Sequence, residues 1–164
     1  MTKIYIIGPV GSGKTTLGKK IAKDLNIKHY ELDQITWKYN PYGADWRRSD
    51  EEILAIFNSI ITKNDWIIEN VGKKIYSSAY KVADTIIYID LPKYILYKRI
   101  FIRWMKQKMK LYPYSIKPTL KSLYQMFLWV KNDKGNKKLE ELQKFKDKIV
   151  ILNKNNLNGY KYKI

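Results

Sequence analysis

The sequence predicts an α/β fold in three layers, built around a five-stranded parallel sheet. Two observations lead to this prediction: short apolar runs alternate with segments of helical periodicity, and a glycine-rich stretch, GPVGSGKTT, directly follows the first apolar run. The runs show little polar alternation, as is typical of strands buried on both faces. The five expected strands are Ile4–Ile7, His29–Leu32, Trp66–Glu69, Thr85–Ile89 and Ile149–Leu152.

Helical patterns fill the gaps between these strands. The segment Ser49–Ile61 opens with Ser49-x-x-Glu52, a capping box that satisfies free amide donors, and then repeats apolar residues at helical spacing. Pro92 predicts the start of a helix, because the N–H that proline lacks has no hydrogen-bond partner at that position. We expect this helix to run to about Lys110. The other expected helices are Lys14–Leu25, Thr119–Val130 and Lys137–Phe145.

The chain has the length of one domain, so residues 1–164 are expected to fold as a single unit. Residues 99–131 form an expected helical insertion, broken by Pro113 and Pro118, that could close as a lid. The formal net charge is +17, and no acidic residue lies between Asp90 and Asp133. Such a charge attracts anionic partners of any kind, whether nucleotide, nucleic acid or acidic lipid surface.

Several function classes are excluded by composition. The chain has no cysteine and one histidine, so disulfides, thiolate metal sites and multi-histidine metal sites are ruled out. No apolar stretch is long enough for a membrane span, and the start of the chain does not resemble a secretion signal. We therefore expect a cytoplasmic protein, whose oligomeric state the sequence leaves open.

The stretch Gly8-x-x-x-x-Gly13-Lys14-Thr15 matches the Walker A pattern in full, between an expected strand and an expected helix. In this pattern glycines turn backbone N–H groups toward the phosphates, and the helix N-terminus adds its positive dipole end. The pattern predicts a P-loop NTPase fold that binds ATP, with Lys14 on the β- and γ-phosphates and Thr15 on Mg²⁺. The residues expected at the nucleotide are Gly8, Gly11, Ser12, Gly13, Lys14, Thr15 and Thr16.

Two arginines on one helix extend this site. Arg99 and Arg103 are four residues apart, so their guanidinium groups point the same way. Such a pair suits the clamping of a triphosphate or the stabilisation of a transferring phosphoryl group, and we predict a catalytic role for both with Lys14. The alternative is a solvated basic face.

Carboxylates are expected where two strands end. Asp33 closes the second expected strand and Glu69 the third, at the carboxyl edge where α/β sheets bind ligands. We predict that Asp33 acts as the base or anchors the phosphoryl acceptor; a helix-cap aspartate is the alternative. Glu69 is predicted to hold Mg²⁺ through water.

An aromatic segment follows Asp33. Aromatic rings with arginines alongside suit a flat, anionic acceptor such as a nucleotide, whereas packing of Trp46 on the next helix is the alternative. The residues concerned are Trp37, Tyr39, Tyr42, Trp46, Arg47 and Arg48.

Two segments of the chain resemble a known class of enzymes. GPVGSGKTTLGKKIAKDLNIKHYELD looks like the start of adenylate-kinase-like P-loop kinases, and Pro92, Arg99 and Arg103 reproduce the spacing of a proline and two arginines in them. A closer resemblance, over roughly residues 3–104, is to the bacterial DNA topology modulation proteins. It rests on Leu32-Asp33, Trp37, Trp46, WIIEN and DTIIYIDLP. Those relatives tend to read Asp-Gly-Asn where this chain reads Glu69-Asn70-Val71.

These features together predict a phosphotransferase that moves the γ-phosphoryl group of ATP to a small acceptor, with Mg²⁺. The acceptor could be a nucleotide, a nucleoside or another small compound. Two alternatives stay open: a nucleic-acid-associated ATP-binding protein, since residues 93–131 interleave lysines with aromatic residues, and a regulatory nucleotide-binding protein without catalysis.

Overall fold

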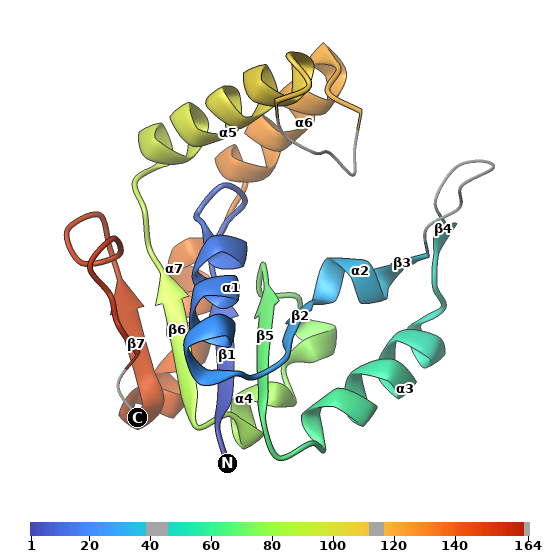
Figure 1. Cartoon of the computed structure of the whole chain (residues 1–164), viewed down its shortest axis with the longest axis vertical. Coiled ribbons are helices and arrows are strands. Elements are labelled where there is room, and N and C mark those ends of the chain that lie inside the picture. Colours follow the sequence, from blue (N-terminus) through green and yellow to red (C-terminus); the bar gives the residue numbers. More distant parts are fainter. Residues whose placement is uncertain (39–45, 112–116, 163–164) are drawn as a thin grey trace.

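The computed structural model describes residues 1–38, 46–111 and 117–162. Its centre is a five-stranded, all-parallel sheet in the order β2-β5-β1-β6-β7 (Figure 1). The strands are β1 (Lys3–Ile7), β2 (His29–Glu31), β5 (Trp66–Asn70), β6 (Thr85–Ile89) and β7 (Ile149–Leu152). The predicted α/β fold with five parallel strands is thereby confirmed.

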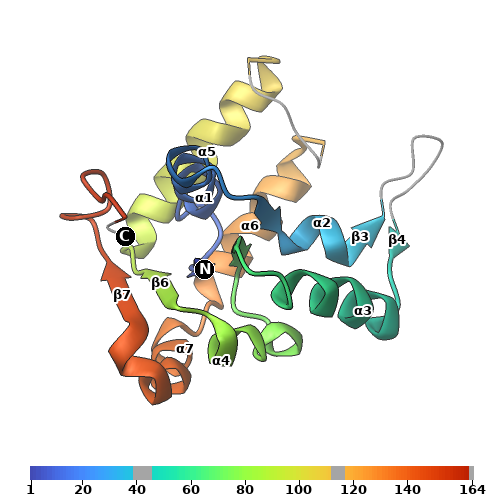
Figure 2. The same ribbon diagram turned by 60° about the horizontal axis from the view of Figure 1, so that its bottom comes forward.

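Helices cover both faces of this sheet and complete three layers. Successive residues of β1 point to opposite faces: Ile4 and Ile6 enter one apolar cluster, and Tyr5 and Ile7 enter the other. The first cluster is closed by α1 (Lys14–Leu25), α5 (Lys93–Lys108) and α6 (Leu120–Lys131). The second is closed by α3 (Asp50–Ile61), η1 (Lys74–Tyr76), α4 (Ala79–Val82), α7 (Gly135–Leu142) and η2 (Gln143–Lys148) (Figure 2).

The second strand is shorter than the sequence predicts. It ends at Glu31, and the fully buried Leu32 begins the short helix α2 (Leu32–Thr36). At the end of this helix the Thr36 hydroxyl donates to the Leu32 carbonyl at 2.9 Å and lies 2.8 Å from the Tyr76 hydroxyl. Asp33 therefore lies in the first turn of a helix and not at the end of a strand. The predicted strand ends at Leu32, but in the structure the buried Leu32 is already the first residue of α2.

Other element boundaries differ slightly from the predicted ones. The capping box at the start of α3 is confirmed, since the Ser49 side chain accepts from Glu52 N and the Glu52 side chain accepts from Ser49 N. Helix α5 stops at Lys108, and Lys110 then takes a left-handed backbone conformation. Helix α7 begins earlier than predicted, at Gly135, and gives way to the 3₁₀ turns of η2.

A two-stranded antiparallel ribbon follows α2. It consists of β3 (Trp37–Lys38) and β4 (Trp46–Arg47), in which Trp37 is opposite Arg47. Tyr39 and Tyr42 of the aromatic segment lie outside the described residues, as do Tyr112, Pro113 and Tyr114 of the insertion.

The predicted helical insertion is present as α5 and α6, which pack on each other. Tyr97 and Phe127 meet edge to face with ring centroids 5.1 Å apart, and the Trp104 indole N–H donates to the Thr119 carbonyl at 3.0 Å. Thr119 also caps α6 through a reciprocal pair of bonds with Ser122. Within the described part of the chain, no helix combines the length and apolar character needed to cross a bilayer.

Gly18 of α1 lies against the imidazole of His29. A Cβ atom at position 18 would come within 2.4 Å of His29 Nε2, a distance that real Cβ atoms do not tolerate. The absence of a side chain at this buried point of α1 therefore lets His29 reach inward from β2 to the end of β5.

We predict that Gly18→Ala destabilises the protein by about 1–3 kcal/mol, since the steric conflict outweighs the roughly 1 kcal/mol that alanine gains over glycine in a helix. Urea unfolding measures the change, and Gly159→Ala is the control because nothing lies within 4 Å of a Cβ there. In a double-mutant cycle, Gly18→Ala should cost much less stability when His29→Ala is already present. Additive effects of the two changes on the free energy of unfolding would contradict the contact.

Candidate active site

The glycine-rich loop joins β1 to α1 and leaves the start of α1 open. Gly11 and Gly13 have φ angles of +79° and +96°, a backbone conformation that residues with a Cβ rarely adopt. Gly13 is the N-cap of α1, and no side chain caps the helix there. The first backbone N–H groups of α1 therefore face the loop with the positive end of the helix dipole, which is an anion-binding arrangement.

Lys14 and Ser12 are the polar side chains inside this loop. The Lys14 ammonium donates to the Pro9 carbonyl at 2.9 Å, and the Ser12 hydroxyl is buried with no hydrogen-bond partner. Burial lowers the pKa of Lys14 to about 8; Glu69 and Asp33 oppose this shift, while Lys138 and Arg103 add to it. An anion bound in the loop would form an ion pair with the Lys14 ammonium.

Thr15 and Glu69 form the predicted metal-binding side of the site. The Thr15 hydroxyl donates to Glu69 Oε1 at 2.5 Å, so the two groups are in direct contact. Glu69 Oε2 lies 3.4 Å from His29 Nε2, and both side chains are almost fully buried. His29 thus backs the carboxylate on the side away from Thr15. Thr16, the last predicted loop residue, is exposed on the first turn of α1.

The two predicted arginines approach the loop from α5. Arg99 Nη1 donates to the Ser12 carbonyl at 2.9 Å, so the insertion is tied to the phosphate loop at its base. One turn later Arg103 Nη2 lies 3.2 Å from Met126 Sδ on α6, and the positive charge of Arg103 helps to lower the pKa of Lys14. Both arginines are half-buried with protein partners, and only Arg99 contacts the loop directly, so a catalytic role for the pair stays a prediction.

Asp33 lies on the other side of Lys14, exposed to solvent. It forms an ion pair with Lys73, in which Nζ is 3.2 Å from Oδ1, and 69% of the aspartate side chain is exposed. Its charge acts on the pKa of Lys14, as does that of Lys138 from α7. Lys138 packs against Gly72 and is itself paired with Asp133. Asp33 and Lys138 thus both act on Lys14, and Lys73 is paired with Asp33.

The aromatic segment and its arginines lie on the ribbon at the far end of α2 (Figure 1). Trp37 and Trp46 are about half exposed, at 47% and 48%. Arg47 pairs with Asp50 at 2.5 Å, and Arg48 donates to three carbonyls, those of Gln34, Ile35 and Trp37. Both arginines therefore have protein partners, and an acceptor-binding role for these four residues stays a prediction.

The sequence analysis missed Lys73 and Lys138. Lys73 directly follows the turn after β5, so its place beyond a strand's carboxyl end was the available signal. Lys138 lies on α7, on the face of the sheet opposite to α1, and nothing in the local sequence distinguishes it from other lysines. Asn70 shapes this turn: its side-chain oxygen accepts from the N–H groups of Gly72 and Lys73, at 2.7 and 2.8 Å.

The parallel sheet, the open helix start, the lysine and the hydroxyl–carboxylate pair define a P-loop NTPase. The sequence family described as an AAA domain matches residues 4–122 of this chain. Because the match covers well over half of the chain, the protein belongs to that family.

Curated proteins similar to this chain include shikimate kinases. That of Baumannia cicadellinicola subsp. Homalodisca coagulata is 30% identical over 100 residues, which are 53% of this chain and 57% of that protein. Shikimate kinase 1 of Salmonella newport (strain SL254) is 29% identical over 83 residues, 45% of this chain and 47% of that protein. The chain thus spans about half the length of the curated relatives it matches.

Among solved structures, a gluconokinase from Sinorhizobium meliloti 1021 has a TM-score of 0.52 and 17% identity, covering 93% of this chain and 82% of that one. At this identity the likeness supports the fold. The resemblance to P-loop small-molecule kinases is supported by these relatives, whereas the resemblance to DNA topology modulation proteins stays a prediction.

We predict that ATP binding without divalent cations weakens as pH rises through the pKa of Lys14. Binding requires the charged ammonium, and a lysine with a pKa of about 8 is protonated at pH 7 and about nine-tenths neutral at pH 9. Calorimetry should show roughly tenfold weaker binding at the higher pH, with proton uptake. Lys14→Arg is the control, because arginine stays charged and should give a much flatter profile. Equal profiles for the two proteins would contradict the shifted pKa.

Proposed function

We propose that this protein is an ATP-dependent kinase that phosphorylates a hydroxyl group of a small, anionic molecule. The observation that carries the proposal is the position of Lys14. Its ammonium lies in the phosphate loop and within electrostatic reach of both Glu69 and Asp33. The phosphate-binding side and the proposed acceptor side thus converge on one charged group.

The donor side fits a triphosphate with Mg²⁺. The uncapped start of α1, the buried Ser12 hydroxyl and Lys14 can hold phosphate oxygens, and Thr15 with Glu69 can hold the ion. Among the described residues there is no cluster of three or more His, Cys, Asp or Glu side chains that could hold a metal. Mg²⁺ commonly takes one or two protein ligands together with phosphate or water oxygens. The bound ion would neutralise developing charge on the phosphates.

Arg99 and Arg103 complete the donor side. Arg99 orders the loop by its bond to the Ser12 carbonyl, and both guanidinium groups add positive charge where a phosphoryl group would transfer. Fixed positive charge of this kind supplies most of the catalysis in phosphoryl transfer, since the reaction needs little covalent help from the protein.

The acceptor side is the exposed surface around Asp33. Its carboxylate can orient an acceptor hydroxyl and take its proton, while the oxygen forms a bond to the γ-phosphorus and the bond to the β-phosphate oxygen breaks. Lys73 pairs with this carboxylate and Lys138 adds positive charge near Lys14, so an acceptor that also carries a negative group would be held.

The names of the relatives give the first acceptors to test. Two curated relatives are shikimate kinases and the structural neighbour is a gluconokinase, so shikimate and gluconate are the leading acceptors. Nucleotides and nucleosides belong on the same panel, because Trp37, Trp46, Arg47 and Arg48 are predicted to suit a flat anionic acceptor.

We expect the wild-type protein to transfer label from γ-labelled ATP with Mg²⁺ to one member of this panel. Lys14→Ala should remove transfer, and Asp33→Asn should lower kcat by roughly 100-fold or more while ATP binding stays intact. Asp24→Asn, an exposed carboxylate on α1, is the matched control and should behave as wild type.

Two outcomes would overturn parts of this assignment. ATP binding without any labelled acceptor would favour the regulatory alternative. Transfer that Asp33→Asn leaves unchanged would keep the kinase but remove Asp33 from the acceptor side.

A further inference from the structure

The side of α5 that faces away from the phosphate loop carries a row of exposed apolar side chains. We call it the α5 outer face. Its apolar members have between 40% and 64% of their surface exposed, although side chains of this kind are usually buried. They are Tyr94, Phe101, Ile102, Met105 and Met109.

Helical geometry places these residues on one side. The positions recur at spacings of three, four, seven and eight residues, so they share a face. The opposite side holds the buried Leu96, Ile100 and Trp104, and Arg99 turns toward the phosphate loop. Figures 1 and 2 both show α5 at the periphery of the molecule, with α6 along its inner side.

Lysines frame the α5 outer face. Lys98 lies within it, and Lys106 and Lys108 project from its two edges when 100° per residue is counted around the helix. No aspartate or glutamate occurs from residue 91 to 132. The surface is therefore apolar with one lysine, Lys98, among the apolar side chains and with lysines along both borders, a composition typical of a helix that lies in a lipid interface.

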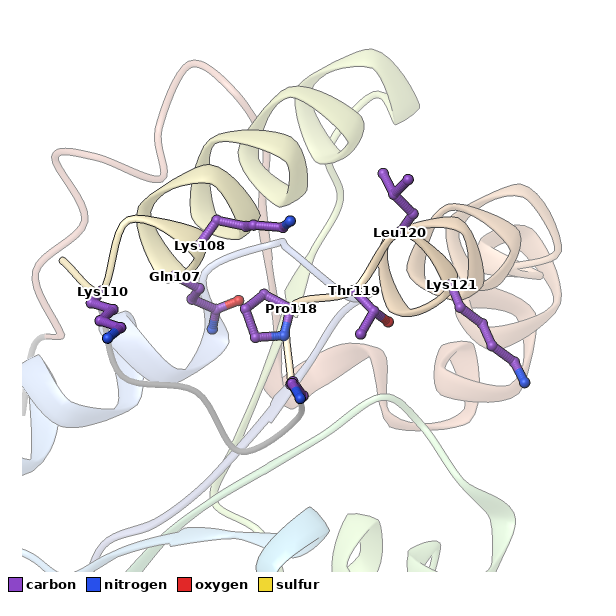
Figure 3. A pocket seen from close by; sticks show the side chains of 8 residues that line it. Gln107, Lys108, Lys110, Pro118, Thr119, Leu120 and Lys121 are labelled. Atoms are coloured by element: carbon purple, nitrogen blue, oxygen red, sulfur yellow. The ribbon is translucent and has the colours of Figure 1, made fainter.

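A basic hollow lies at the C-terminal end of α5 and shares Lys108 with the border of the α5 outer face. It has a volume of about 610 Å³, and side chains from α5 and from the start of α6 surround it (Figure 3). The described residues that line it include four lysines, Lys108, Lys110, Lys117 and Lys121, and no acidic residue. Leu120 at its edge is 71% exposed, so the hollow also joins positive charge to apolar surface.

We propose that the α5 outer face and the adjoining hollow are a docking surface for an anionic lipid bilayer. The apolar side chains enter the boundary between headgroups and acyl chains, and the lysines contact lipid phosphates. Arg99 and the phosphate loop lie on the inner side of α5, so a docked protein keeps its nucleotide site away from the membrane.

Charge and shape favour a bilayer over two other partners. A second copy of the chain joined through this face by a two-fold axis would bring like charges together, with no acidic residue to offset them. Single-stranded nucleic acid binds by stacking bases on aromatic rings, but Ile102, Met105 and Met109 offer none. The ring of Phe101 already stacks on Trp104, with centroids 6.1 Å apart.

The test is flotation of the full chain with lipid vesicles at about 0.15 M salt. We expect binding to vesicles of phosphatidylcholine with about 30% phosphatidylglycerol, and at least tenfold less binding to phosphatidylcholine alone. Ile102→Ser with Met105→Ser, and separately Lys98→Glu with Lys106→Glu, should each weaken binding roughly tenfold or more. ATP binding should persist in both variants, which confirms that they are folded.

Matched controls lie on the other parts of the surface. Leu54→Ser on α3 and Lys23→Glu on α1 change an exposed leucine and an exposed lysine, and should alter vesicle binding by less than about twofold. Since the chain has no cysteine, a fluorophore on Met105→Cys should shift to shorter wavelengths on vesicles, and the same fluorophore on Leu54→Cys should not.

Three outcomes would overturn the proposal. The first is vesicle binding that Ile102→Ser with Met105→Ser leaves unchanged, which would indicate charge attraction alone. The second is no vesicle binding together with tight binding of a single-stranded oligonucleotide at the same salt. The third is a dimer in sedimentation equilibrium that the same serine variant dissociates. Loss of kinase activity alone would not bear on the docking surface.

Discussion

The parallel pairing of β1 with β5 is the constraint on which the site depends. In this register Ile6 is opposite Glu69 and Ile7 is opposite Asn70, so the carboxylate comes to the edge of the sheet beside the loop that follows β1. A slip by one residue would exchange the two faces of the strand and turn Glu69 away from Thr15. The apolar residues on both faces of the two strands oppose such a slip, since each would leave its own cluster.

Close packing behind this edge holds the polar groups in place. His29 reaches Glu69 only because Gly18 leaves room for the imidazole, and Glu69 in turn accepts from the Thr15 hydroxyl. Burial lowers the pKa of Lys14 to about 8, and an incoming phosphate group would favour its charged form. The site thus combines a buried carboxylate side with a lysine whose pKa a bound phosphate would raise.

Helix α5 presents two different surfaces. Its inner side ties the insertion to the phosphate loop through Arg99 and rests Ile100 on Gly11. Its outer side is apolar and basic with no acidic residue nearby. The excess positive charge of the chain is therefore divided: arginines face the proposed transfer site, whereas lysines frame the outer surface.

Local sequence by itself determined the five strands, the phosphate loop and the capped start of α3. Strand burial follows from apolar runs, the loop follows from Gly8 to Thr15, and the capping box at Ser49 follows from short-range bonding. Only the tertiary structure decided that Leu32 would begin a helix, that His29 would lie behind Glu69, that Lys73 would pair with Asp33, and that Lys138 would act on the pKa of Lys14. Those contacts join residues far apart in the chain, so they depend on strand order and on packing between layers, which local propensity does not encode.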